Sequence, residues 1–194
     1  MLKLFLLLIF VVSVNANSFS LFQGEVRAHT EVFGDSTINP KSTKINSLLL
    51  MPKGVESLKG SISFDALSLV SDNLDRDEHM YEALNVKNHT FISFQIKSVQ
   101  KQGTEYLLKG KLTLNGTQKD IESLVSVVQK EGTLELAGTF SIMMSDFNIE
   151  PPTLLFLTVR DQVDIEYTLN YKEERESNEK NNFSTTASNI TVFK

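Results

Sequence analysis

The sequence predicts an all-β protein, a closed antiparallel barrel of about eight strands with one short helix over an opening. Apolar and polar residues alternate along most of the chain, which is the period of a half-buried strand. Short turn signals separate these segments, without the regular strand and helix alternation that builds a parallel sheet. Such an antiparallel sheet either closes on itself or folds into a sandwich. Closure is favoured because it leaves no exposed edges in a chain with no cysteine, where no disulfide can hold the sheet.

The first 16 residues predict a secretory signal peptide. Lys3 precedes an unbroken apolar run over 4–12, and Val14 and Ala16 provide the small residues of a cleavage site. The run is shorter than the roughly 18 to 20 residues that a membrane-spanning helix needs. We therefore expect cleavage after Ala16, no stable membrane insertion afterwards, and a periplasmic location. A secreted chain without cysteine is more typical of a bacterial periplasm than of a eukaryotic secretory route.

Eight segments of the body, residues 17–171, are expected to form strands, and this body is expected to be one domain. In the clearest case, Leu108, Leu112 and Leu114 share one face of a strand while lysine and threonine side chains alternate with them. Asn115-Gly116 follows directly and predicts a tight hairpin. The expected strands are 18–33, 44–51, 60–70, 90–99, 106–114, 119–129, 133–142 and 163–170.

One segment, 74–84, departs from the strand period and predicts the helix. Leu74, Tyr81 and Leu84 have the spacing of an amphipathic helix. Asp72 or Asn73 can cap its beginning, and the acidic residues of its first turn suit the helix dipole. We expect this helix to pack over one opening of the barrel.

The last segment, 172–194, is polar and charged without an apolar period, and it is expected to be a disordered tail. The whole chain carries a formal charge of −5 and has a pI of about 5.3. It contains no basic run of the kind that binds phosphate backbones. Nucleic acid is therefore not an expected partner.

The sequence offers little support for catalysis or for a bound metal. Its three imidazoles are His29, His79 and His89, and none stands in a recognisable motif with a nucleophile or as paired zinc ligands on one helix. The segment 73–84 lacks the glycine and the glutamate of a calcium-binding loop. We therefore expect no metal and no cofactor. The alternation alone leaves open whether the interior is filled by side chains or holds one small apolar ligand.

Four short blocks resemble those of the YceI-like family of periplasmic lipid-binding proteins, in matching order over roughly residues 24–171. The blocks are Arg76-Asp77-Glu78-His79-Met80, Ile92-Ser93-Phe94, the hairpin 110–119 and the turn 145–149. The chain departs from the family pattern at its amino-terminal histidines, where Ala28-His29-Thr30 is the nearest match. It also has Gln118 where Thr is common and Asn148 in place of a glycine. These departures indicate a divergent member.

The resemblance implies a lipocalin-like barrel whose apolar cavity holds an isoprenoid or a fatty amphiphile, without cofactor or catalysis. Arg76, Asp77 and His79 match the family's helical motif, and a role in fixing the helix over the barrel is favoured for them. In the alternative, His79 or Asn73 contacts a ligand headgroup. The side chains expected to line the cavity are Phe64, Phe94, Ile96, Leu112, Leu114, Leu136, Phe140, Ile142, Val163, Ile165 and Tyr167.

Three functions are compatible with these observations. The leading hypothesis is a periplasmic carrier that holds a polyisoprenoid or another long-chain lipid. The second is a structural or interaction module of the cell envelope with a solid core. The third and weakest is an enzyme that acts on a quinone or a lipid. Assembly as a homodimer is an open option in each case.

Overall fold

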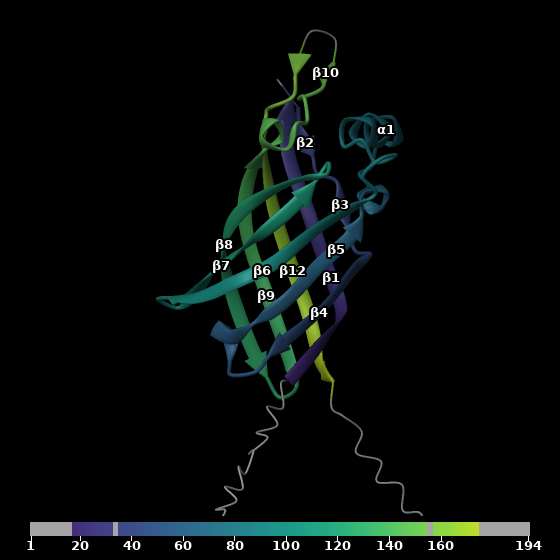
Figure 1. The fold of residues 1–194 in the computed structure, drawn as a ribbon. Coiled ribbons are helices and arrows are strands. Elements are labelled where there is room, and N and C mark those ends of the chain that lie inside the picture. The colour runs from purple at the N-terminus through teal and green to yellow at the C-terminus, as the bar shows by residue number, and fades with distance from the viewer. Residues whose placement is uncertain (1–16, 33–34, 155–156, 175–194) are drawn as a thin grey trace, which may run out of the picture.

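The computed structural model describes residues 17–32, 35–154 and 157–174. Eight long strands form one antiparallel barrel, because the first and the last of them pair with each other as well as with their neighbours along the sheet (Figure 1). The sheet is therefore a closed barrel and not a sandwich, as the sequence favours. The barrel strands are β1 (Asn17–Val32), β4 (Ile45–Met51), β5 (Lys59–Asp65), β6 (Phe91–Gln102), β7 (Glu105–Leu114), β8 (Thr117–Lys130), β9 (Thr133–Met143) and β12 (Gln162–Glu174).

Short elements complete the fold, and the helix and one short hairpin among them lie at one end of the barrel. The only α-helix among the described residues is α1 (Leu74–Ala83), and Figure 1 places it at the same end as the β10 hairpin. No helix in the described ranges is long and apolar enough to cross a lipid bilayer. The remaining elements are the strands β2 (Asp35–Ile38), β3 (Lys41–Ser42), β10 (Thr153–Leu154) and β11 (Leu157–Thr158), and the 3-10 turns η1 (Val55–Ser57), η2 (Ala66–Ser68) and η3 (Met144–Phe147).

The expected hairpin at Asn115-Gly116 is confirmed. Leu114 and Thr117 pair across it, and both turn residues have positive φ, 47° and 68°. Two consecutive residues with positive φ match the twist of the flanking strands, which is why this dipeptide favours a tight hairpin.

Two strand boundaries differ from the sequence expectation. The segment expected as strand 60–70 ends as a strand at Asp65, whose carboxylate accepts a hydrogen bond from Leu67 N (2.8 Å) and starts η2. At the other end of the chain, β12 continues to Glu174, three residues into the expected tail. Backbone pairing with β1 orders these polar residues, and Ser18 lies opposite Glu174. The expected signal peptide 1–16 and the rest of the expected tail, 175–194, lie outside the described residues.

Two bulges change which residues face inward. In β1 the pairing with β12 shifts between Leu21 and Gln23, so that Phe19 and Gly24 both point inside although their spacing is odd. In β6 the pairing with β7 shifts between Ile96 and Ser98. These shifts let long strands follow the curved barrel while apolar side chains stay inside.

The interior has two apolar clusters. The larger one fills the barrel end where β1 begins and β12 ends, and its most buried members include Phe19, Leu49, Val125 and Tyr171, each at most 1% exposed. The smaller one lies at the α1 end, around Leu112, Leu114, Ile142, Phe147 and Ile149. The barrel therefore has a packed end and an α1 end, and these two names are used below.

Candidate binding cavity

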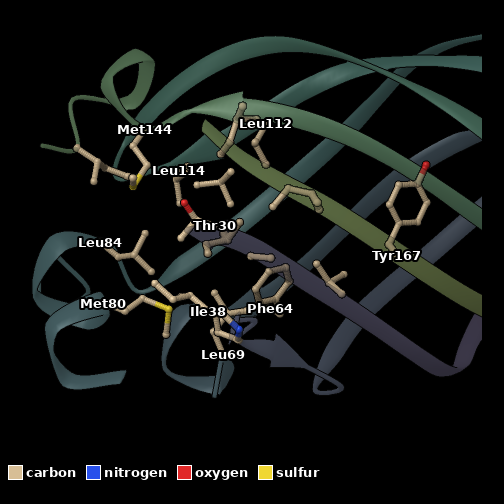
Figure 2. Close-up of a pocket in the computed structure, with 18 of the residues that line it drawn as sticks. Thr30, Ile38, Phe64, Leu69, Met80, Leu84, Leu112, Leu114, Met144 and Tyr167 are labelled. Atoms are coloured by element: carbon tan, nitrogen blue, oxygen red, sulfur yellow. The ribbon is translucent and has the colours of Figure 1, made fainter. Parts of the chain in front are cut away.

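A cavity of about 310 Å³ occupies the α1 end of the barrel. Its volume lies at the lower limit of the roughly 300–1,000 Å³ range of small-molecule sites. Inward-facing apolar side chains of the strands form its wall, and α1 and η3 border its outer part. Figure 2 shows Met80 of α1 and the C-cap residue Leu84 on one side and Met144 on the other, with Tyr167 far from all three.

Ten of the eleven side chains expected to line a cavity do border this one. They are Phe64, Phe94, Leu112, Leu114, Leu136, Phe140, Ile142, Val163, Ile165 and Tyr167. Ile96 is the exception, because it is 4% exposed within the packed end and does not reach the cavity. Phe94 of the same strand borders the cavity instead, and its ring lies over Gly110, the residue of β7 that pairs with Ile96.

Sequence reasoning did not identify several other bordering side chains. Val26, Ala28 and Thr30 come from β1, where the bulge displaces the inward-facing set by one residue. Met80 comes from α1 and Leu84 is its C-cap, and their spacing of four residues puts both on the side of the helix that faces the barrel. Ile38, Leu69 and Val159 come from loops or short strands, for which no periodic signal exists.

The helical motif fixes α1 to the barrel through Asp77. This side chain is 3% exposed, and its carboxylate accepts hydrogen bonds from Ser71 N (3.0 Å) and Ser71 Oγ (2.7 Å). Tyr81, one turn further on, donates its hydroxyl to Leu69 O (2.6 Å). Asn73 caps the helix by accepting from Arg76 N (3.0 Å) and does not border the cavity. These contacts are architectural.

Arg76, Asp77 and His79 all border the cavity, and of these His79 is exposed. His79 Nδ1 lies 2.8 Å from Asp75 O. A carbonyl oxygen can only accept, so Nδ1 carries the proton and Nε2 is a hydrogen-bond acceptor in the neutral ring. His79 Nε2 can therefore accept a hydrogen bond from a hydroxyl of a ligand headgroup, whereas Asn73 Oδ1 already accepts one from Arg76 N at the helix cap.

The deepest polar groups of the cavity are paired inside its wall. The hydroxyls of Tyr167 and Ser123 lie 3.0 Å apart, and Ser123 donates to Thr139 O (3.0 Å). Burial raises the pKa of Tyr167, and the hydrogen bond with Ser123 only partly opposes this shift. Ser123 uses its proton on a carbonyl and has a neutral phenol as its other partner, so it lacks the base that activates a nucleophile.

The three histidines are separated from this pair. His29 contacts Asn39 and Glu31, and His89 lies against the turn at Gly116. Within residues 17–32, 35–154 and 157–174, no three His, Asp or Glu side chains are grouped as metal ligands. The arrangement is that of an apolar compartment with a polar border.

Comparison with known proteins gives one family. A family model described as the YceI-like domain matches residues 10–171. A relative, a UPF0312 protein of Pectobacterium atrosepticum, is 29% identical over 107 residues, which covers 47% of this chain and 52% of the relative. The chain thus spans about half the length of the curated relatives that it matches.

Solved structures share the fold. The chain is similar to BcnA of Burkholderia cenocepacia, with a TM-score of 0.68, 20% identity and coverage of 76% of this chain and 95% of BcnA. It is also similar to a polyisoprenoid-binding domain of Saccharophagus degradans, with a TM-score of 0.63, 12% identity and coverage of 80% and 98%. The family model covers most of the chain, and these neighbours have the same barrel. The chain belongs to the YceI-like family.

Proposed function

We propose that this protein is a non-catalytic carrier that holds a polyisoprenoid or another long-chain amphiphile in the barrel cavity. The observation that carries the proposal is the cavity of about 310 Å³, bounded by apolar side chains from six barrel strands and from α1. An apolar tail fits this wall, and a polar headgroup fits the border at Arg76 and His79.

The energetics of tail burial support this assignment. Each buried CH₂ contributes about 0.8 kcal/mol, so a tail with about ten buried methylene groups contributes about 8 kcal/mol. That free energy corresponds to roughly micromolar binding. The entropy lost when the tail is ordered lowers the net binding free energy below this value. No specific polar contact is required for useful affinity, and the headgroup has mainly an orienting role.

The family supports the same ligand class. The domain of Saccharophagus degradans with the same fold is described as polyisoprenoid-binding. Its 12% identity to this chain supports the shared barrel, and the ligand class reaches this chain as part of the proposal.

Extraction of the natively purified protein with organic solvent, followed by mass spectrometry, tests the proposal. We expect one class of long-chain lipid in near-stoichiometric amount. A lipid-free extract from protein purified without detergent would contradict a carrier function and favour a module whose cavity has no ligand.

A cavity-filling variant sharpens this test. Ala28 borders the cavity, and Ala28→Trp fills part of its volume, so the lipid content should fall sharply. Ala137 of β9 lies outside the cavity border, between the inward-facing Leu136 and Gly138, so Ala137→Trp is the matched control. Equal lipid content in the two variants would place the lipid elsewhere on the protein.

We further propose that residues 1–16 are a cleaved signal peptide and that the carrier works in the periplasm; the apolar run after Lys3 and the small residues at Val14 and Ala16 support this. Expression of the full chain in a Gram-negative host should give a product that begins at Asn17 and is released by osmotic shock. Retention of residues 1–16 on the product, or its recovery with the cytoplasm, would contradict this location.

A further inference from the structure

The cavity ends where the packed end of the barrel begins. Four members of the buried cluster of the packed end also border the cavity, and we call them the cavity floor. They are Leu108, Leu136, Tyr167 and Leu169. Three of the four are at most 3% exposed, and Tyr167 is 9% exposed. Behind them lie side chains with almost no exposure, such as Leu134 and Tyr171, so a tail that reaches the floor meets close packing.

Glycines on neighbouring strands leave the space in which two floor side chains lie close to the barrel wall. Leu169 lies opposite Gly24 of β1, and a Cβ on Gly24 would lie 2.8 Å from Leu169 Cδ2. Tyr167 lies opposite Gly138 of β9, and a Cβ there would lie 2.5 Å from the Tyr167 hydroxyl oxygen. Because glycine has no Cβ, each side chain can lie flat over the neighbouring strand.

Tyr167 is fixed in this position by its hydrogen bond. Its side chain crosses β9 above Gly138 and reaches Ser123 on β8 at 3.0 Å. Phe140 stands beside it with a ring-centroid distance of 6.3 Å, within the usual range for aromatic pairs. Figure 2 shows the Tyr167 ring well inside the barrel, away from Met80 and Leu84.

We propose that the floor formed by Leu108, Leu136, Tyr167 and Leu169 sets the maximum tail length that the protein accepts, and that Gly24 and Gly138 set the height of this floor. The inference rests on the proposed carrier function and adds to it a selection of ligands by tail length. A tail that ends at the floor buries every methylene group, whereas a longer tail must leave its excess outside the cavity.

Unbranched 1-alkanols of increasing length, titrated into lipid-free protein by calorimetry, test this inference. Each added carbon that enters the cavity should raise the affinity about fourfold, the equivalent of about 0.8 kcal/mol per CH₂. The affinity should stop rising at the length where the tail meets the floor. A continuous rise with no plateau would overturn the inference.

Leu136→Ala should move this plateau to longer alcohols. The substitution removes three side-chain carbons from the floor, so the tail should gain about three carbons of depth and up to roughly 60-fold in affinity for the longest alcohol. Leu134→Ala is the matched control, because Leu134 is equally buried, lies on the same strand and does not border the cavity. The same plateau in both variants would overturn the inference. If Leu136→Ala does not fold, Leu169→Val makes a smaller change in the floor and should lengthen the accepted tail by about one carbon.

Gly138→Ala should move the plateau in the opposite direction, since the added Cβ drives the Tyr167 ring into the cavity. The double variant Gly138→Ala with Tyr167→Leu removes the ring and should restore at least the original length. A plateau that Gly138→Ala leaves unchanged would overturn the role of the glycines. Absence of binding by the unmodified protein at every alcohol length would instead overturn the carrier function, and the inference with it.

Discussion

Replacing Asp77 with alanine should detach α1 from the barrel while leaving the strands in place. Asp77 is 3% exposed, and its carboxylate accepts from both the backbone N–H and the hydroxyl of Ser71. Hydrogen bonds to a charged group contribute about 1.5–3 kcal/mol each, and the removal of a buried charge offsets part of the loss. We expect the free energy that holds α1 closed to fall by about 2–4 kcal/mol.

Hydrogen–deuterium exchange measures this effect directly. A loss of about 2–4 kcal/mol corresponds to a roughly 30- to 700-fold faster exchange of amides in the second half of α1, if local opening controls the exchange. Amides of β7 and β8 should change little, because the hydrogen bonds of Asp77 go to Ser71, outside both strands, and the opening is local. The same variant should release bound lipid faster, since Met80 and Leu84 border the cavity.

Asp75→Ala is the matched control. Asp75 is exposed, lies in the same first turn, and contributes only its carbonyl to the contact with His79. It should lose only the favourable interaction with the helix dipole, about 0.3–1 kcal/mol. Equal exchange rates of α1 in the Asp75 and Asp77 variants would refute the view that the carboxylate of Asp77 anchors the helix.

Three further predictions concern the barrel. Hydrogen bonds from Ser141 and Gln162 and the charge of Arg160 lower the pKa of Asp164 to about 2. Its carboxylate therefore stabilises the fold above about pH 4, and this contribution is lost as the pH falls from 4 to 2. In acid unfolding, Asp164→Asn should lose less stability over that range than the unmodified protein. Burial raises the pKa of Tyr171 above the ordinary value of 10, so the stability of the protein should fall above pH 10, and less steeply in Tyr171→Phe. At neutral pH, Tyr171→Phe should lower the free energy of unfolding by about 1 kcal/mol, measured by denaturant unfolding. A chain that ends at Tyr171 loses the β12 pairs of Lys172–Glu174 and should melt at a lower temperature than one that ends at Glu174.

Each of these has a contrary outcome. Parallel acid curves for the Asp164 variant and the unmodified protein would remove the stabilising role of that carboxylate. Parallel alkaline curves for the Tyr171 variant would mean that this phenol ionises equally in both states. Equal melting temperatures for the two truncated chains would show that the last three residues of β12 add no stability.

The period of the strands made the barrel predictable, but the cavity was not predictable from it. Inward-facing positions are apolar in both halves, so a packed and a hollow barrel have the same alternation. The two ends of the barrel differ in the size of their inward-facing side chains and in which residues lie next to each other on neighbouring strands. Phe19 and Tyr171 fill the packed end, whereas Ala28 borders the hollow one.

Errors in the sequence reasoning have local physical causes. Ile96 was expected at the cavity because strand period does not give depth along the barrel axis, and its level belongs to the packed end. The sequence predicts too early an end for β12, because a polar segment usually indicates disorder, whereas the backbone of β1 supplies partners to Lys172–Glu174 whatever their side chains. The helix and its cap at Asn73 were predictable, since both depend on local sequence.

The pairing of β1 with β12 determines when the barrel can form. These strands stand at opposite ends of the described chain, so their contact closes a loop that contains every other strand. Strands that are adjacent in sequence, such as β7 and β8, need only a short loop to pair. The pairing of β1 with β12 needs the closure of a loop of almost the whole described chain, which costs more entropy. A sheet that lacks this pairing has two unpaired edges of the kind that can join another copy of the chain. The pairing of β1 with β12 therefore protects both edges at once, in addition to closing the barrel.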